Sequence, residues 1–502
     1  MRINDQTSKV DQVSFPAGLK PTIIHKSGEL DRMFDQAELA LAGTGRVYNK
    51  GGALVSLTDD GKTFHLTQPS VLILLARAAD WVKHIRGDDG DVRSKRVDPP
   101  VAVAAALPRW VDWKTMPELL QVVDHPLFLT ESKKLLGQGY DEKSKFFGNF
   151  RPLESVDLQS SKIDAQKAAA EILSLFNTLD LETEADRSAV LCAALTAVAR
   201  AALKTAPLFL ITAPVIGSGK GMVARLLARF AQAGEPSSKT LQSDDDEIKK
   251  ELISALLTGA SVLFFDEVKG GEIDSVPLRT LATSETFGGR LLGTNTDVKL
   301  STRSLILITG NNVTPSADTA RRVLEIRLNP HCESPAVRNF KTDPIQFFDQ
   351  HRYTFIRAAL TIQAAYLKFV ESGGLIPEAP GIGSFTDWNE WCRLPVLWLT
   401  GNDPATRLLN QLKFDPVKVE LGEVLSEWNR EFGDKAVSAS EVCKSQKLYE
   451  AIKSVAGARS RDLSTSDVGR WIAKQRDRVV AGRRLEKSDS ITNVAKWRVV
   501  CH

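Results

Sequence analysis

The sequence contains a lysine, Lys220, between a glycine-bearing loop and the start of a predicted helix. The apolar run Leu208-Phe-Leu-Ile-Thr212 predicts a buried strand, and the apolar stretch Met222–Phe230 after the lysine predicts a helix. In such an arrangement backbone N–H groups and the helix dipole face an anion, and the lysine reaches the terminal phosphates. The residues expected to contact phosphate are Pro214, Gly217, Ser218, Gly219, Lys220, Gly221 and Met222.

This loop departs at two positions from the general pattern G-x-x-x-x-G-K-[ST]. Pro214 stands where the first glycine is expected. Gly221 stands where a serine or threonine supplies a hydroxyl ligand to magnesium. For this segment alone, the alternative is an ordinary turn between a strand and a helix with a surface lysine.

A pair of carboxylates further along the chain, Asp266 and Glu267, favours the phosphate interpretation. They end the run Val262-Leu-Phe-Phe-Asp-Glu267, whose apolar residues predict a strand buried on both faces of a parallel sheet. Ligands bind at the carboxyl edge of such sheets. Asp266 is placed to hold magnesium, directly or through water, and Glu267 to polarise an attacking water as general base. Adjacent acids also occur as plain turn residues.

Two further segments carry polar residues with a role in phosphoryl transfer. Leu305-Ile-Leu-Ile-Thr-Gly-Asn-Asn312 predicts another buried strand, and Asn311 at its end is expected beside the terminal phosphate, where it positions the lytic water. Asp318-Thr-Ala-Arg-Arg322 offers Arg321 or Arg322 to stabilise charge in the transition state. The alternative for either arginine is a helix-end residue paired with Asp318.

Composition points to a globular protein of several domains. The 502 residues are 43% hydrophobic and 25% charged, with a net charge of +3. Five scattered cysteines include no CxxC pair, which disfavours a disulfide framework or a zinc site. The polar N-terminus lacks the apolar stretch of a signal peptide, and no apolar run approaches bilayer length. We therefore expect a soluble cytoplasmic protein without a membrane partner.

The elements that must position these residues change character along the chain. Short strands alternate with helices over 207–330, which predicts a parallel sheet with crossover helices and the α/β class. An apolar helix is predicted around Val71–Ile85 in the first region. The predicted domains are an α+β N-terminal domain that is a collar, a DNA-binding domain or a partner-binding domain (1–155), an ATPase domain (156–345), a helical region (346–432) and a basic C-terminal domain (433–502).

Together, Lys220, the Asp266-Glu267 pair, Ile308-Thr-Gly-Asn-Asn312 and Asp318–Arg322 resemble the AAA+ replicative DNA helicases of phages and mobile genetic elements. These helicases are similar in style to superfamily 3 and MCM helicases and include self-loading types. The resemblance covers roughly 205–410 and 440–500 and is weak before 150. It implies an AAA+ P-loop parallel sheet core, and the absence of a hydroxyl at Gly221 leaves water or Asp266 to take its place at magnesium.

The resemblance also implies a ring, usually a hexamer, with ATP and Mg²⁺ between subunits. Lys220, Asp266, Glu267 and Asn311 would come from one subunit and the arginine from its neighbour. A hairpin predicted over Arg290–Leu300 would grip single-stranded DNA in the central channel. The candidate contacts there are Arg290, Lys299 and Arg303. The alternative is a solvent-exposed hairpin.

The C-terminal domain resembles the winged helix of this family. Residues 441–502 contain 14 Lys/Arg and 7 Asp/Glu, and Ser464 offers a cap for a helix over Val468–Lys474. The segments Val479-Val480 and Trp497–Val499 are predicted as wing strands. Basic residues on the helix and wing suit duplex DNA, although winged helices are also protein-contact modules. The candidate contacts are Arg470, Lys474, Arg483 and Arg484.

The sequence leaves three hypotheses open. The first is an ATP-dependent, ring-forming DNA helicase that replicates a phage or mobile element, with a primase, polymerase or initiator as partner. The second is an AAA+ ATPase that remodels DNA or acts in defence without unwinding. The third is a structural DNA-binding protein whose loop binds nucleotide but turns it over slowly, because Gly221 replaces the hydroxyl residue.

Overall fold

The computed structural model describes residues 20–86, 88, 90–151, 156–291, 296–330, 343–413, 416–456, 462–488 and 494–501. The chain divides into two compact units, Met1–Arg407 and Leu408–His502. The second unit begins before residue 433, where the basic domain was predicted to start. In the described ranges no helix combines the length and the apolar character needed to cross a bilayer.

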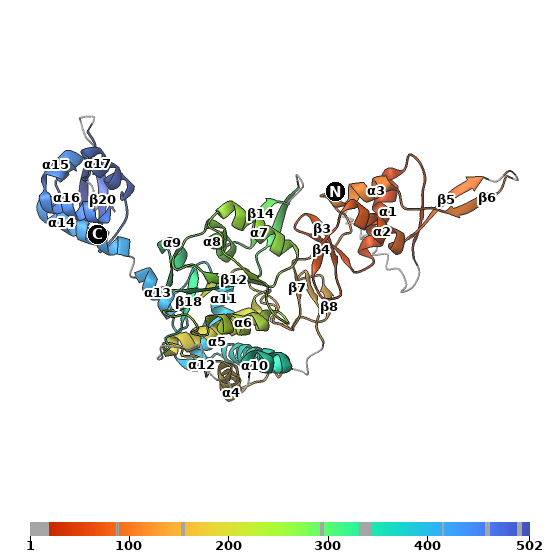
Figure 1. Cartoon of the computed structure of the whole chain (residues 1–502), viewed down its shortest axis with the longest axis horizontal. Coiled ribbons are helices and arrows are strands. Elements are labelled where there is room, and N and C mark those ends of the chain that lie inside the picture. Colours follow the sequence, from red (N-terminus) through yellow and green to blue (C-terminus); the bar gives the residue numbers. More distant parts are fainter. Residues whose placement is uncertain are drawn as a thin grey trace, which may run out of the picture. The chain divides into compact units, whose positions relative to one another are not determined.

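Five strands of the first unit, of which Figure 1 labels β12 and β18, form one parallel sheet. Their order is β11-β12-β16-β10-β18. The strands are β10 (Leu208–Ala213), β11 (Ser238–Lys239), β12 (Val262–Val268), β16 (Leu305–Asn311) and β18 (Val323–Arg327). The apolar residues of β10, β12 and β16 are buried, as runs without polar alternation predict for strands covered on both faces. The predicted α/β class with a parallel sheet is confirmed.

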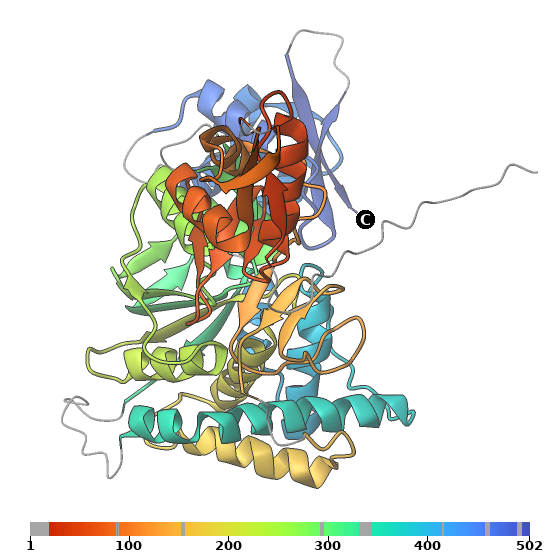
Figure 2. The same ribbon diagram turned by 90° about the vertical axis from the view of Figure 1, so that its right-hand side faces the viewer.

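Helices α5 and α6 pack against this sheet, and α4 and α10 run side by side beyond them (Figure 2). Nearly all of α5 is buried, which suits its sequence of alanine and leucine. A capping box between Ser161 and Asp164 starts α4. The helices of this part are α4 (Lys162–Ser174), α5 (Glu184–Ala199), α6 (Lys220–Ala231), α7 (Asp245–Leu257), α8 (Val276–Thr283), α9 (Ala317–Ala320), α10 (Pro344–Glu371), α11 (Thr386–Trp388), η3 (Asn389–Arg393) and α12 (Leu394–Thr400). Helix α13 (Thr406–Lys413) contains the boundary between the two units.

The region before residue 150 mixes helices with three small three-stranded sheets. Its main apolar core gathers buried residues of both kinds of element, including Leu41, Val47 and Trp81. The elements are β1 (Thr22–Ile24), α1 (Leu30–Ala42), β2 (Val47–Lys50), β3 (Ala53–Leu57), β4 (Thr63–His65), α2 (Gln68–Ala78), β5 (Asp80–Arg86), β6 (Val92–Arg96), α3 (Val101–Ala106), η1 (Leu107–Arg109), β7 (Gln121–Val123), β8 (Gly139–Asp141) and β9 (Phe146–Gly148).

The predicted helix around Val71–Ile85 is wrong in its second half. Helix α2 ends at Ala78, and strand β5 follows. The first three residues of β5, Asp80–Val82, pair in parallel with β1. Trp81 is buried, and its indole N–H donates to the Leu75 carbonyl at 3.2 Å. Pairing with a distant strand therefore overrides the local helical pattern.

Two pairs of short strands leave the central sheet. Strands β13 (Gly271–Ile273) and β17 (Val313–Pro315) are parallel, whereas β14 (Thr286–Arg290) and β15 (Asp297–Ser301) form an antiparallel ribbon. A hairpin is present as predicted, but its first strand ends at Arg290 and so lies before the predicted range Arg290–Leu300, whereas its second strand falls where it was predicted. Most of its predicted turn lies outside the described residues.

In the second unit, helices cover a three-stranded antiparallel sheet in the order β19-β21-β20. Its buried core includes Trp428, Ile452, Ile472, Leu485 and Trp497. The elements are α14 (Pro416–Phe432), β19 (Val437–Ser438), α15 (Ala439–Lys444), α16 (Gln446–Val455), α17 (Thr465–Lys474), β20 (Arg483–Ser488) and β21 (Lys496–Cys501).

The second unit confirms one predicted boundary and corrects another. Ser464 caps α17 in a capping box with Asp467, as its position before the helix predicts. The segment Val479-Val480 is not a wing strand, because Ala481 and Gly482 adopt positive φ angles of 48° and 71°. After this turn the chain enters β20, so Arg483 and Arg484 lie in a strand and not between two strands as predicted.

The turn between β2 and β3 contacts the β14–β15 ribbon through backbone atoms. Lys299 N–H donates to the Gly51 carbonyl at 2.8 Å. Gly51 has a φ of +58°, and a Cβ at this position would collide with the carbonyl oxygen of Lys299. Only glycine therefore allows this approach without displacement.

Replacing Gly51 by alanine is expected to destabilise the first unit more than the same change at Gly45. Both glycines have positive φ, but a Cβ at Gly45 meets nothing within 4 Å. Gly45→Ala should lower the free energy of unfolding by about 1–2 kcal/mol through backbone strain, and Gly51→Ala by about 1–3 kcal/mol more through collision. Chemical unfolding measures both, and hydrogen exchange at the Lys299 amide should accelerate only in Gly51→Ala. Equal losses in the two variants would contradict the contact.

Candidate nucleotide-binding site

The loop between β10 and α6 has a backbone shape suited to phosphate. Gly217 and Gly219 have φ angles of 75° and 97°, in the left-handed region that favours glycine. Gly219 is the N-cap of α6, and a Cβ there would lie 2.6 Å from Leu179 Cδ2. The structure thus requires both glycines where the strand turns into the helix. Pro214 is exposed on this loop, and Met222 lies in the first turn of α6.

Lys220 begins α6, and only 9% of it is exposed. Its Nζ donates to Asn311 Oδ1 at 2.5 Å and to Ser218 Oγ at 3.0 Å. Burial lowers the pKa of Lys220, and the nearby charges of Asp266 and Glu267 oppose that shift. The partners of its ammonium are thus neutral oxygens, which an anion can replace with stronger, charge-assisted bonds.

The Asp266-Glu267 pair lies at an irregularity where β12 pairs with β16. The register shifts between Phe265 and Val268, and Glu267 has a positive φ of 52°. This bulge keeps Asp266 partly buried and leaves Glu267 exposed. The strand end therefore directs the two adjacent carboxylates into different surroundings, as separate roles require.

Thr309, which was not predicted from the sequence, holds the Asp266-Glu267 pair in position. Its hydroxyl donates to Asp266 Oδ1 at 2.5 Å and accepts the Glu267 backbone N–H at 3.0 Å. Thr309 is 1% exposed. The only sequence signal was a hydroxyl residue in an otherwise apolar strand, and its partners follow from the pairing of β12 with β16.

Asn311 joins the lysine and the carboxylates because β16 lies between β10 and β12. In the register with β10, Asn311 is opposite Ala213, the last residue before the phosphate loop. The next residue, Asn312, donates from Nδ2 to the Pro214 carbonyl at 3.3 Å. Lys220 and Asn311 thus meet directly, and Asp266 lies on the adjacent strand.

The residues at this edge fit a nucleoside triphosphate with a divalent cation. The loop and the buried lysine suit phosphate, and Asp266 uses Oδ1 for both of its described hydrogen bonds, leaving Oδ2 for a cation. A Cβ at Gly221 would meet nothing within 4 Å, so the absence of a hydroxyl there does not reflect crowding. Among the described residues, no group of three or more His, Cys, Asp or Glu side chains could hold a metal ion by itself.

Arg321 and Arg322 lie at the opposite edge of the sheet. They immediately precede β18, and the Arg322 carbonyl accepts the N–H of Leu208, the first residue of β10. The phosphate loop begins after the last residue of β10, Ala213, about 16 Å away at 3.3 Å per residue. This separation places the arginines beyond reach of a phosphate held by Lys220 of the same chain.

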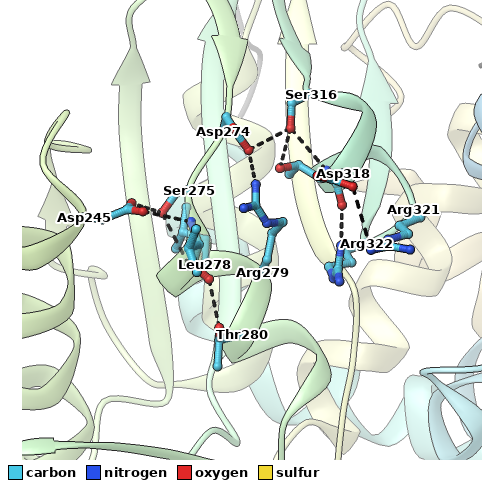
Figure 3. Close-up of polar contacts among 12 residues, drawn as sticks. Asp245, Asp274, Ser275, Leu278, Arg279, Thr280, Ser316, Asp318, Arg321 and Arg322 are labelled. Carbon is cyan, nitrogen blue, oxygen red and sulfur yellow. Dashed lines mark hydrogen bonds and ion pairs between the residues drawn. The ribbon is translucent and has the colours of Figure 1, made fainter. Parts of the chain in front are cut away.

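The two arginines differ in their surroundings (Figure 3). The Arg321 side chain is 53% exposed and lies 3.8 Å from the Asp318 carboxylate. Arg322 is partly buried and donates to the Asp318 carbonyl. Burial lowers the pKa of Arg322, and the neighbouring Arg321 and Arg279 lower it further. The helix-end pairing with Asp318 is present, and it leaves Arg321 largely accessible.

A polar network supports the short helix that carries these arginines (Figure 3). The Asp274 carboxylate accepts from Arg279 and from Ser316 Oγ, the latter at 2.9 Å. The Ser316 hydroxyl also caps α9 by accepting the Thr319 N–H at 3.3 Å. Asp274 follows β13 and Ser316 follows β17, so the pairing of these two strands brings the two side chains together.

The predicted DNA contacts in the first unit fall into two groups. Arg290 and Lys299 are exposed on the β14–β15 ribbon. Arg303 lies beyond the ribbon, where its guanidinium donates to the Ala201 carbonyl at 2.9 Å and packs over the ring of Phe146. Its position joins two parts of the unit and does not favour a role as a DNA contact.

Several of the predicted DNA-contact residues of the second unit form ion pairs or hydrogen bonds with neighbouring residues of the chain. Lys474 is exposed, and Arg470 is exposed although it pairs with Asp467 at 2.7 Å. Arg484 is half-buried and bonded to Glu486, and Arg483 donates to Ser426 Oγ at 3.3 Å. The helix residues are thus more accessible than those of the strand.

Comparison with known proteins finds no matching family model and no matching curated protein. Among solved structures, the chain is similar to the C-terminal region of NrS-1 in its apo A form, with 11% identity and a TM-score of 0.38 over 93% of this chain and 99% of that chain. It is also similar to the JCV helicase, with 12% identity and a TM-score of 0.24 over 51% of this chain and 62% of that chain. At these values the function has to be inferred from the site itself.

Replacing Thr309 by valine is expected to lower the turnover of nucleotide about 10- to 100-fold with little change in nucleotide affinity, because the Asp266-Glu267 pair loses its positioning hydroxyl while Lys220 and the loop remain. Steady-state hydrolysis and equilibrium binding measure the two effects. Thr309→Ser should restore turnover. Thr302→Val, which also removes a buried threonine hydroxyl near the other end of β16, is the control for a loss of stability. A similar fall in turnover in that variant would refute the positioning role.

Proposed function

We propose that this chain is an AAA+ P-loop ATPase that assembles into a ring and unwinds DNA. The observation that carries the proposal is the division of the site between two edges of one sheet. Lys220, Asp266 and Asn311 gather at the carboxyl edge, whereas Arg321 and Arg322 lie at the amino edge. The order of the strands, with β16 between β10 and β12, supports the AAA+ class because it places Asn311 between the lysine and the carboxylates.

The carboxyl edge carries the groups that ATP hydrolysis requires. When bound, ATP with magnesium supplies the phosphoryl group that is transferred to water. Lys220 neutralises the terminal phosphates, and Asp266 holds the cation through Oδ2 or a water. Glu267 accepts the proton of the attacking water as general base, and Asn311 orients that water after leaving Lys220.

Within one chain, the two edges of the sheet cannot contact the same nucleotide. This separation suits a head-to-tail assembly. In such an assembly, the amino edge of one copy meets the carboxyl edge of the next, and rotation closes the ring. Arg321, the more exposed of the two arginines, would then contact the neighbour's phosphates and stabilise charge in the transition state. A hexamer is the ring size that the family resemblance implies.

DNA contacts are proposed for one element of each unit. Arg290 and Lys299 on the β14–β15 ribbon would grip single-stranded DNA in the ring channel. The second unit, with its helices and antiparallel sheet in the order β19-β21-β20, supports a winged helix. Arg470 and Lys474 on α17 would contact the phosphates of duplex DNA. A primase, polymerase or initiator would complete replication of a mobile element or phage.

Purified protein with ATP and magnesium is expected to separate the strands of a forked DNA duplex. Lys220→Ala removes the phosphate contact and Glu267→Gln removes the general base, so both should lose at least about 100-fold of the unwinding rate. A strand-displacement assay measures this loss beside ATP hydrolysis on DNA. If the wild-type protein hydrolyses ATP on DNA but displaces no strand, the helicase assignment is wrong and a DNA-remodelling ATPase takes its place.

Mixing two inactive variants tests whether the arginine acts between subunits. Lys220→Ala subunits keep the arginines, and Arg321→Ala/Arg322→Ala subunits keep the phosphate loop. Each alone should lose about 10³-fold or more of the ATPase rate, and mixed assemblies should recover activity at the interfaces that combine an intact loop with intact arginines. No recovery in mixtures that demonstrably co-assemble would show that the arginines do not serve a neighbouring site.

Ser316→Ala is expected to lower the ATPase rate of the assembly roughly 10-fold while nucleotide affinity stays unchanged, because α9 loses the hydroxyl that ties it to Asp274. Ser275→Ala is the matched control, since Ser275 caps α8 in the same way but bonds to Asp245. Both changes remove one N-cap and should cost about 1 kcal/mol of stability. An equal fall in turnover in both would mean that the effect comes from stability alone.

A further inference from the structure

A second two-stranded ribbon extends from the region before residue 150 (Figure 1). The base of β5 pairs with β1 on one side as far as Val82, and β6 pairs with β5 on the other. Beyond Val82 the two strands pair only with each other, and Lys83–Arg86 and Val92–Lys95 are exposed throughout. We call these eight residues the N-terminal ribbon. Neither of its faces contributes to an apolar core, so folding alone does not explain its side chains.

The ribbon holds like charges opposite one another. Lys83 is directly opposite Lys95 in the antiparallel register, and like charges at such positions destabilise a strand pair. In the described part of the chain, neither lysine has a carboxylate within ion-pair distance. Arg96, just below them, is paired with Asp80 at 3.2 Å. The two unpaired lysines place two positive charges side by side on the surface, where they can meet an external anion.

The amino-acid composition of the ribbon favours duplex DNA over single-stranded nucleic acid and over a membrane as the anionic partner. It contains no Phe, Tyr or Trp, so it lacks the stacking platforms that hold the bases of single strands. Its stem is basic, but Asp88 and Asp91 lie near its tip, which disfavours a flat anionic surface such as a membrane. A two-stranded ribbon fits the major groove of duplex DNA, where basic residues meet the backbone phosphates.

We propose that the N-terminal ribbon binds duplex DNA, with Lys83 and Lys95 contacting backbone phosphates. This inference rests on the proposed function, for which the duplex is the substrate, and it adds a duplex contact in a region that has no part in nucleotide chemistry. Exposed Ile85 and Val92 would contact the apolar parts of the groove. The ribbon shares no residue with the carboxyl edge, so its contact with DNA is tested without nucleotide.

The test is the affinity of the full-length Lys83→Gln/Lys95→Gln variant for a blunt DNA duplex without nucleotide. Fluorescence anisotropy over a salt series should show that the slope of log affinity against log salt is smaller by about 1.8, at about 0.9 per lost phosphate contact. At low salt the affinity should fall about tenfold. Both positions are exposed, so the variant should fold normally. ATP hydrolysis stimulated by single-stranded DNA should remain at the wild-type rate.

Lys62→Gln/Lys114→Gln is the control, because it removes two exposed lysines from the same region, each of them paired with an aspartate. If the control loses as much duplex affinity as the ribbon variant, the loss comes from net charge alone, and the proposal is wrong. A Lys83→Gln/Lys95→Gln variant with wild-type duplex affinity and salt slope would also overturn the proposal. So would a variant that binds duplex DNA normally but binds phosphatidylserine vesicles less tightly than the wild-type protein does. In these cases wild-type unwinding stands. If the wild-type protein binds no DNA, the proposed function fails as well.

Discussion

Strand β16 is hydrogen-bonded to β10 on one side and to β12 on the other. This double pairing sets the positions of Thr309 and Asn311, which are two residues apart and therefore lie on the same face of the strand. Thr309 reaches the Asp266-Glu267 pair on one neighbouring strand, and Asn311 reaches Lys220 beyond the other. If the pairing of β16 shifted by one residue, both side chains would turn to the opposite face of the sheet. Thr309 would then lose its contacts with the Asp266-Glu267 pair, and Asn311 its contact with Lys220.

The same strand links the carboxyl edge to the arginines. Beyond Asn311 the chain forms β17, which pairs with the segment that follows the carboxylates, and then α9. The segments that follow Asn311 and Glu267 are thus joined by one short strand pair, and the Ser316–Asp274 hydrogen bond lies at its end. In the proposed ring, this strand pair would couple the nucleotide of one subunit to the arginine that serves the next. Such coupling needs two arrangements of the strand pair.

The sequence was most informative where polar residues end apolar runs. Lys220 was predicted from the glycine-bearing loop before a helix, and Asp266 and Asn311 from their positions at the ends of apolar strands. Thr309 could not be predicted, because its partners depend on which strand lies beside β16. The errors at Val71–Ile85 and Val479-Val480 share a physical cause. In the first, pairing with β1 overrides local periodicity, and in the second, Ala481 adopts a left-handed φ that its residue type rarely shows.

The open space at Gly221 bears on how the proposed site would hold its cation. A hydroxyl residue would fit there without collision, so its absence removes a ligand without altering the shape of the loop. The protein ligands of a bound magnesium would then be carboxylates, and water would supply the remaining ligands. Because Thr309 and the Glu267 N–H occupy Asp266 Oδ1, Oδ2 would bear most of that role. The orientation of one carboxylate would therefore matter more here than in a loop that contributes its own hydroxyl.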